Sequence, residues 1–309
     1  MNVLITGGTG LIGELLTKML LERNYTVTIL TRDKSKYKSS AGLSYAEWDV
    51  EKQTIDPNAI QAADYIIHLA GEGIADKRWT KKRKKEIQES RIKSGELLVK
   101  ALKENKHKVK AFVSASAIGW YGPDPVVPNP KPFVETDPAN NEFLGETCQR
   151  WEASTRAVEE MGMRRVLCRT GIMLSGRGGA LPEFRKPLNF GMATILGGGK
   201  QVVSWIHEKD LCRIYIEAIE NENFRGPINA VAPAPVNNRQ LVLSLAKKRN
   251  GKFFVPFPVP AFLLKVVVGE VSIEVLKSTT VSDQKLLSLG FQFSYPTLDD
   301  ALNDFFPDH

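Results

Sequence analysis

A glycine-rich segment near the N-terminus constrains the fold of this chain more than any other feature. The segment Thr6-Gly-Gly-Thr-Gly-Leu-Ile-Gly13 follows a short β-branched run, residues 2–6, and opens a stretch of leucines at helical spacing. Glycines in this context permit a tight turn, a close approach of the backbone to a ligand, and close packing of a helix on a strand. The helix N-terminus then faces a pyrophosphate, so we expect cofactor contacts from Gly7, Thr9, Gly10, Leu11, Ile12 and Gly13.

Segments typical of strands and helices alternate along the first half of the chain. Apolar, β-branched runs predict strands near residues 2–6, 25–31, 43–48, 63–70, 110–116 and 164–170. Apolar spacing predicts helices over 10–23 and 143–161, and a basic helix that begins after Thr80 as its N-cap. This order predicts an α/β fold with a doubly wound parallel Rossmann sheet. After about residue 175 the alternation weakens, which predicts a smaller mixed C-terminal lobe.

The composition excludes several classes of protein. Of 309 residues, 42% are hydrophobic and 25% are charged, as in ordinary globular domains. The three cysteines, at 148, 168 and 212, show no metal-ligand spacing, so we expect no metal site and a reducing, cytoplasmic location.

The N-terminus lacks the features of a signal peptide. The most apolar stretch, residues 253–269, contains three prolines and Lys265, so we expect a buried part of the C-terminal lobe and no membrane partner.

The net charge of +7 is concentrated in one segment. Residues 77–110 hold 14 Lys and Arg but only 4 Glu. Such a run is either a solvated helix face or a region that attracts an anionic cofactor or substrate. Only Trp79 interleaves the basic residues, and no recognisable nucleic-acid module surrounds them, so we expect no nucleic-acid partner. The sequence leaves the oligomeric state open.

The end of the second predicted strand indicates the type of dinucleotide. Sites selective for NAD usually place an acidic residue there to bind the ribose hydroxyls. This strand instead ends in Leu30-Thr31-Arg32-Asp33. Thr31 and Arg32 suit a 2′-phosphate, because a guanidinium pairs with it bidentately. We therefore expect NADP(H). NAD(H) stays as the less favoured alternative, because an acidic residue, Asp33, is present but lies two residues beyond the usual position.

With these motifs in view, the chain resembles the extended short-chain dehydrogenase/reductase superfamily and, more closely, its atypical epimerase-like branch of YfcH type. The resemblance rests on the glycine turn and on motifs spread over nearly the whole chain, namely Trp48-Asp49-Val50, His68-Leu-Ala-Gly71-Glu72, Ser90-Arg91, Trp151-Glu152, Arg169-Thr-Gly-Ile, Gly176-Arg-Gly-Gly and Ser204-Trp-Ile-His207. It implies a Rossmann domain over residues 1–232, with its core in 1–175. It also implies a small family-specific domain over residues 253–301, which contributes to the substrate lobe.

The resemblance also implies roles for single residues. Asp49 would bind the adenine amino group, and Ser116 sits where the superfamily places its substrate-polarising Ser or Thr. His207 and Asp210 match a scaffold segment, in which Asp210 would cap the helix that runs through Ile219. Further cofactor contacts are implied for Val50, Leu69, Ala70, Gly71, Glu72, Ser114 and Ala115.

One departure from the superfamily concerns its catalytic pair, a Tyr followed four residues later by Lys. None of the seven tyrosines has such a lysine, and Leu144 and Cys148 stand at the expected places. The best remaining proton carriers are Ser116 and Tyr121, followed by Glu72 and Asp76. Each has a structural alternative: Tyr121 could pack beside Trp120, Cys148 could be a small apolar residue rather than a reactive thiol, and Glu72 could form an ion pair with Arg78 or Arg91.

Two classes of function follow from these features. The first is an NADP(H)-binding oxidoreductase or epimerase-like enzyme that acts on a small molecule; the second is a non-catalytic NADPH-binding sensor or scaffold. Nucleotide sugars are not expected as substrates. The position at which related sugar-nucleotide enzymes carry a diphosphate-binding Arg is Val203, and Lys200 is only a partial substitute.

Overall fold

A large, mostly parallel sheet organises the molecule. The computed structural model describes residues 1–307. Eight strands follow the order β12-β7-β6-β5-β1-β2-β3-β4, and every neighbouring pair is parallel except β3 with β4. Their bounds are β1 Asn2–Thr6, β2 Thr26–Thr31, β3 Leu43–Asp49, β4 Thr54–Ile55, β5 Tyr65–His68, β6 Ala111–Ala117, β7 Arg164–Thr170 and β12 Gly226–Ala230. The strand order reverses between β1 and β5, where doubly wound sheets bind ligands.

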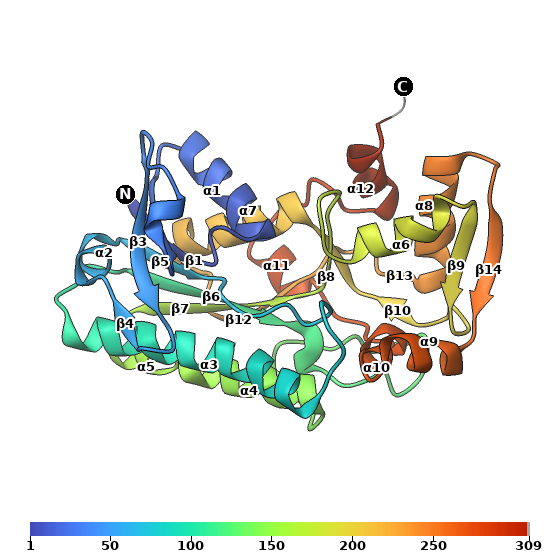
Figure 1. Cartoon of the computed structure of the whole chain (residues 1–309), viewed down its shortest axis with the longest axis horizontal. Coiled ribbons are helices and arrows are strands. Elements are labelled where there is room, and N and C mark those ends of the chain that lie inside the picture. The colour runs from blue at the N-terminus through green and yellow to red at the C-terminus, as the bar shows by residue number, and fades with distance from the viewer. Residues whose placement is uncertain (308–309) are drawn as a thin grey trace.

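Helices cover both faces of the sheet, which confirms the predicted fold class (Figure 1). One face carries α1 (Leu11–Glu22) and α7 (Glu208–Glu220), and the other carries α2 (Pro57–Ala62), α3 (Lys81–Glu104), α4 (Phe143–Ser154) and α5 (Ala157–Glu160). Alternate residues of β1 divide between the two cores: Val3 and Ile5 pack with α1, and Leu4 packs on the other side. The strands are therefore apolar on both faces, as a sheet buried between helix layers requires.

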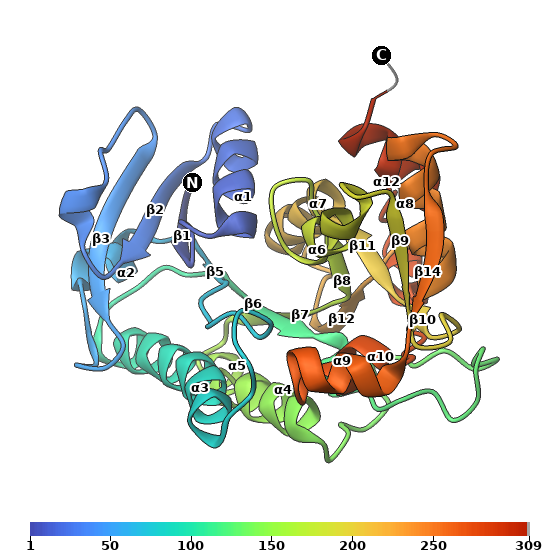
Figure 2. The same cartoon turned by 45° about the vertical axis from the view of Figure 1, so that its right-hand side comes forward.

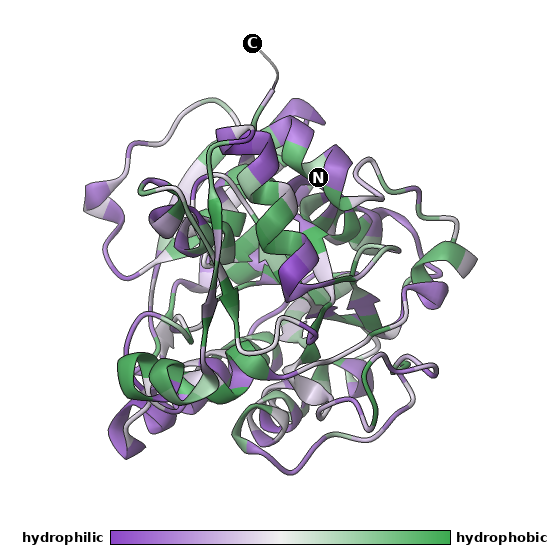
Figure 3. Cartoon of the chain, turned by 90° about the vertical axis from the view of Figure 1, so that its right-hand side faces the viewer, coloured by the Kyte–Doolittle hydropathy of each residue, from purple (hydrophilic) through white to green (hydrophobic). Residues whose placement is uncertain are grey.

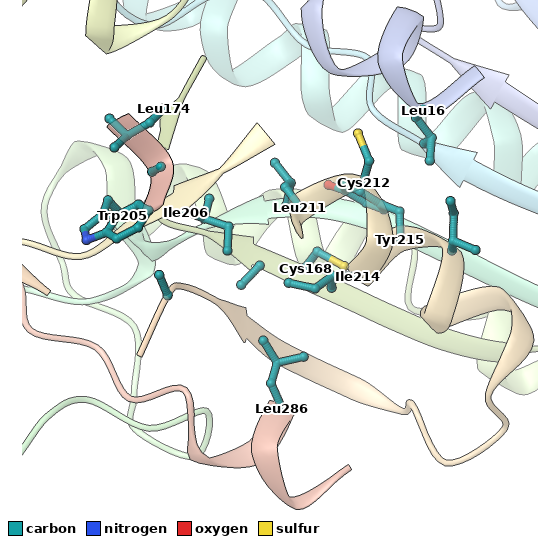
Figure 4. Close-up of a cluster of buried hydrophobic side chains, with 14 of the residues drawn as sticks. Leu16, Cys168, Leu174, Trp205, Ile206, Leu211, Cys212, Ile214, Tyr215 and Leu286 are labelled. Carbon is teal, nitrogen blue, oxygen red and sulfur yellow. The ribbon is translucent and has the colours of Figure 1, made fainter. Parts of the chain in front are cut away.

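Helix α7 returns from the second half of the chain to complete one of these layers. Its side chains Cys212 and Tyr215 are fully buried and gather with Cys168 of β7 and with Leu16 of α1 (Figure 4). His207, not Asp210, is the N-cap of this helix, because its ring accepts the backbone N–H of Lys209 at 3.1 Å. The expectation that Asp210 caps the helix is therefore wrong.

Asp210 instead anchors the C-terminal segment. Its carboxylate is fully buried and accepts the backbone N–H groups of Ser294 and Tyr295 at 3.0 and 2.9 Å, as well as a hydrogen bond from Arg213. A second correction concerns the helix predicted over 143–161, which is interrupted at Thr155 between α4 and α5.

The remaining elements form a mixed second lobe, beside the N-terminal half of the molecule in Figure 2. It holds three two-stranded sheets, β10 with β13, β11 with β8, and β14 with β9. The bounds are β8 Ile172–Leu174, α6 Ala180–Leu188, β9 Met192–Leu196, β10 Val202–Val203, β11 Trp205–His207, β13 Val236–Asn237, α8 Asn238–Asn250, β14 Val255–Val259, α9 Ala261–Val268, α10 Val271–Leu276, α11 Gln284–Ser288 and α12 Leu298–Phe305; short 3-10 turns are η1 Lys34–Lys36 and η2 Ile118–Trp120.

The apolar stretch 253–269 is more exposed than the sequence predicted. Only Leu264 of α9 is buried, whereas Phe262 is 72% exposed, and the hydrophobic ribbon of this helix lies at the surface in Figure 3. Among residues 1–307, no helix is both long and apolar enough to cross a bilayer.

The prolines of β14 keep a further strand from pairing with its free edge. Val255 donates to Gly191 and Val259 accepts from Gly197, so the odd-numbered residues of this strand bond to β9. Pro256 and Pro258 therefore face the free edge, where they offer no N–H to a further strand.

Candidate functional site

The glycine turn lies where the strand order reverses. Gly7 has a φ of +69°, and a Cβ there would lie 2.9 Å from the carbonyl carbon of Leu69, so only glycine fits. A Cβ on Gly13 would collide with the carbonyl oxygen of Gly7, which confirms the close packing predicted for this position. Helix α1 begins after Gly10 with no side-chain cap. The amides of its first turn therefore face the carboxyl edge of the sheet without a protein partner, as an anion site requires.

Thr6 and His68 join the turns that follow β1 and β5. The hydroxyl of Thr6 accepts the backbone N–H groups of Leu69 and Ala70, both at 3.1 Å, and donates to Nδ1 of His68 at 2.7 Å. His68 is fully buried, and burial lowers its pKa to about 3, so the ring is neutral. Its Nε2 then carries the proton and faces the hydroxyl of Ser94 at 3.3 Å. No role was predicted for Thr6 or His68 from the sequence, although each directly precedes a predicted cofactor turn.

Arg32 and Asp33, the two residues that bear on the choice between NADP(H) and NAD(H), follow β2 directly. Arg32 is exposed at the end of β2. Asp33 is occupied locally: it caps η1, accepts from the backbone and hydroxyl of Ser35 at 3.0 and 2.6 Å, and pairs with Lys36. These hydrogen bonds lower its pKa and keep its carboxylate in a turn of its own.

Two further residues predicted to contact the cofactor, Asp49 and Val50, lie at the carboxyl end of β3. Asp49 ends β3, and its carboxylate accepts the backbone N–H groups of Glu51 and Lys52, both at 3.0 Å. Its role toward adenine, like that of Val50, stays a prediction. A cavity of about 330 Å³ adjoins the glycine turn and is lined by Gly8, Thr9, Glu14, Thr17, Ile29, Tyr37, Leu43 and Tyr45.

A buried network of polar groups lies at the carboxyl ends of β6 and β7. Ser116 is 3% exposed and donates to Glu152 of α4 at 2.7 Å. Glu152 in turn receives two hydrogen bonds from Arg169 of β7, at 2.9 and 3.0 Å. Burial alone would lower the pKa of Arg169, but the paired carboxylate raises it. Ser116 is therefore bonded to a buried carboxylate that a buried guanidinium also contacts.

Tyr121 belongs to the far end of this network. It is fully buried, its hydroxyl donates to Asn229 at 2.7 Å, and it accepts a hydrogen bond from Arg169 at 3.1 Å. Burial raises its pKa to about 12. Its ring stacks on Phe133 at 5.2 Å, while Trp120 covers the guanidinium of Arg169 at 3.7 Å. This placement favours a structural role and does not fit Tyr121 as a proton donor to a substrate.

The remaining candidates are also bound within the protein. Glu72 pairs with Arg83 at 3.1 Å, so the partners expected from the sequence, Arg78 and Arg91, were wrong. Arg78 instead donates to backbone carbonyls of α9. Ser114 is buried and donates to the carbonyl of Ala115. Cys148 is buried beside the carbonyl of Ala117, and burial raises its pKa to about 12, which favours an inert thiol.

Arg177 links a loop of the second lobe to the start of α1. Its guanidinium donates to the carbonyl of Leu11 and to Glu208, both at 3.1 Å, and lies 3.7 Å from Glu14. Among the described residues, the site thus combines the glycine turn, the end of β5, the network of Ser116 and one loop of the second lobe. Glu152, Arg169 and Arg177 lie within motifs of the sequence, but the motifs predicted no function for any of them.

The chain resembles known proteins over its full length. Residues 3–230 match the model of the NAD dependent epimerase/dehydratase family, and residues 259–305 match a domain of unknown function, DUF1731. Epimerase family protein YfhF of Bacillus subtilis is 34% identical over 309 residues, which are 100% of this chain and 99% of that protein. Epimerase family protein SSP1921 of Staphylococcus saprophyticus is 36% identical over 303 residues, 98% of each chain.

Solved structures share the fold. Human epimerase family protein SDR39U1 (isoform 2), crystallised with NADPH, matches with a TM-score of 0.85, 28% identity and full coverage of both chains. A nucleoside-diphosphate sugar epimerase from Corynebacterium glutamicum matches with a TM-score of 0.77 and 29% identity, over 99% of this chain and 58% of that one. These matches confirm the resemblance to atypical epimerase-like proteins with a small C-terminal domain, and the chain belongs to the NAD dependent epimerase/dehydratase family.

Proposed function

We propose that this chain is an NADP(H)-dependent oxidoreductase or epimerase that acts on a small molecule. The observation that carries the proposal is the bonded series Ser116–Glu152–Arg169, which ends at the carboxyl edge of the sheet beside the reversal of strand order. A hydroxyl joined to an ionised carboxylate there can move a proton next to a dinucleotide. The human relative crystallised with NADPH supports the choice of cofactor.

The residues at the glycine turn fit a dinucleotide. The uncapped first turn of α1 would hold its pyrophosphate, and Arg32 would hold a 2′-phosphate. Thr6 and His68 keep the two flanking turns together, so the site is formed before the ligand binds. The bound nicotinamide would supply or accept a hydride.

Ser116 and Glu152 would handle the proton. The Ser116 hydroxyl can accept a proton from a substrate alcohol while its own proton passes to Oε1 of Glu152, 2.7 Å away. Arg169 keeps Glu152 in position through two hydrogen bonds. This arrangement would replace the absent Tyr and Lys with a relay through Ser116 and Glu152.

Hydride transfer tests the proposal directly. The protein would be incubated with NADPH deuterated at the transferring position and with a panel of small aldehydes, ketones and hydroxy acids, and the products analysed by mass spectrometry. Transfer of deuterium to any member, lost in Ser116→Ala, supports an enzyme. Tight NADPH binding with no transfer across the panel or to cellular metabolite extracts would favour the second function below.

A non-catalytic NADPH-binding sensor or scaffold is the second candidate. The observation that favours it is the occupation of every candidate hydroxyl: Ser116 donates to Glu152, and Tyr121 is buried against Asn229. Leu144 and Cys148, at the positions of the superfamily's catalytic pair, are buried and offer no acid.

Cofactor preference is the first testable prediction. NADPH is expected to bind about tenfold to a hundredfold more tightly than NADH, because a charge-assisted contact contributes about 1.5–3 kcal/mol. Titration of both nucleotides by protein fluorescence measures the ratio. Arg32→Ala should abolish most of the preference and leave NADH affinity nearly unchanged.

Lys34→Ala is the matched control, since this neighbouring cation is also exposed and begins η1. It should change the NADPH affinity less than twofold. Equal affinities for NADPH and NADH in the natural sequence would refute the assignment of Arg32.

Nucleotide sugars provide the second prediction. UDP- and GDP-sugars are not expected to bind, because Val203 occupies the position of the diphosphate-binding Arg and lies within β10, paired with Val236. Lys200 lies outside this strand, on the rim of a separate cavity of about 350 Å³. Calorimetric titration of UDP-glucose and GDP-mannose into the NADPH-saturated protein should show no heat of binding. Micromolar affinity that falls in Lys200→Ala would contradict this expectation.

A further inference from the structure

Arg91 is a largely buried cation beneath the turn that follows β5. It rises from α3, and its guanidinium carbon lies 3.1 Å from the place where a Cβ on Gly71 would stand. On its other side it faces the ring of Trp151 at 5.0 Å. The absence of a side chain at Gly71 therefore gives the guanidinium a direct path to the cofactor turn.

No carboxylate among residues 1–307 forms a salt bridge with this guanidinium. The guanidinium donates one hydrogen bond, from Nη1 to the carbonyl of Ile87 at 2.9 Å. By contrast, Arg83 pairs with Glu72 and Glu86, and Arg169 pairs with Glu152. Burial lowers the pKa of Arg91, although the charge of Glu72 acts in the opposite direction. Its other N–H groups form no hydrogen bond within residues 1–307. None of them is fully buried, so they face accessible space.

The position of Arg91 relative to α4 indicates which part of the site it serves. Trp151 is three residues from Cys148, the residue at the place of the superfamily's Lys. A guanidinium lying over Trp151 supplies a positive charge from α3 beside α4, in which Cys148 is a buried thiol. The site thus keeps a cation near the end of β5 although the expected Lys is absent.

We propose that Arg91 binds an oxyanion of the ligand that enters this site. A guanidinium presents a planar set of donors that matches a carboxylate or a phosphate, and such a partner would offset the cost of burying the charge. The oxyanion belongs either to the diphosphate of NADP(H) or to a carboxylate of the substrate. The proposal rests on the proposed function, because it assumes that the site at β1 and β5 binds a dinucleotide and its substrate.

Two titrations distinguish an oxyanion of the NADP(H) diphosphate from a carboxylate of the substrate. In the first, NADPH is titrated into the natural protein and into Arg91→Gln; a loss of tenfold to a hundredfold in affinity identifies the diphosphate. In the second, oxalate is titrated into both proteins saturated with NADPH; an unchanged NADPH affinity with loss of oxalate binding identifies a substrate carboxylate. Arg91→Gln that leaves both affinities unchanged, or natural protein that binds neither NADPH nor oxalate at this site, overturns the proposal.

Two controls keep the test decisive. Arg78→Gln removes an exposed guanidinium bonded to backbone carbonyls of α9 and should change neither affinity. Arg91→Lys retains the charge and should keep part of the binding if Arg91→Gln does not fold. Oxalate is also tested on the protein without NADPH: stabilisation against heat that is lost in Arg91→Gln and partly kept in Arg91→Lys, in a protein that does not bind NADPH, would show an oxyanion site while refuting the dinucleotide function.

Discussion

Replacement of Arg169 by methionine is expected to lower the free energy of unfolding by about 3–5 kcal/mol. The guanidinium is 2% exposed and forms two hydrogen bonds to Glu152, which is itself 7% exposed. Its removal leaves a buried carboxylate without a cation, and also leaves the hydroxyl of Tyr121 and the carbonyl of Glu135 without a donor. Urea unfolding followed by circular dichroism measures the loss.

A double variant separates the unpaired charge from the loss of packing. Arg169→Met combined with Glu152→Met removes both charges at similar volume, so it should be more stable than Arg169→Met alone. Arg23→Met is the exposed control, because Arg23 pairs with Glu220 at 3.1 Å but is 44% exposed; it should cost less than about 1 kcal/mol. A cost below 1 kcal/mol for Arg169→Met would show that the pair is hydrated in solution.

The Rossmann sheet could be predicted because its signals are local. The central strands, such as β1, are apolar runs buried on both faces, and the glycine turn follows the first run directly. The second lobe could not be predicted in the same way. Its strands are only two to five residues long and pair across large sequence distances, as β14 does with β9. The apolar stretch 253–269 therefore looked like core, although the lobe leaves α9 at the surface.

The same distinction applies to the site. The cofactor turn lies within eight consecutive residues, so its glycines could be assigned from spacing alone. The proton network could not, because Ser116, Glu152, Arg169 and Asn229 come from four elements and meet only in the folded chain. The sequence showed that the usual acid and base were absent. It could not show that a buried carboxylate bonded to Ser116 stands nearby.

This network leads to the prediction with the largest effect on activity. Ser116→Ala is expected to lower kcat by about 10²–10⁴-fold, the usual contribution of general acid–base catalysis, while the affinity for NADPH stays within twofold. The reason is that Ser116 is the group bonded to Glu152, whereas the glycine turn that would hold the cofactor lies on β1. Steady-state kinetics, combined with fluorescence titration of NADPH, separates the two quantities.

Thr147→Val is the matched control for this substitution. Thr147 lies in α4, the helix that carries Glu152, is 2% exposed, and its hydroxyl donates to the carbonyl of Phe143 at 2.6 Å. It should leave kcat nearly unchanged. Tyr121→Phe should also retain most of the activity and act mainly on stability, because the Tyr121 hydroxyl is buried against Asn229.

The expected rate of carbonyl reduction follows from the same hydrogen bonds. Reduction of a carbonyl needs a proton from Ser116, a weakly acidic hydroxyl that is already bonded to Glu152. Reduction of ordinary aldehydes and ketones with NADPH is therefore expected to be absent or very slow. Fast reduction that is indifferent to both Ser116→Ala and Tyr121→Phe would place the proton donor outside this network.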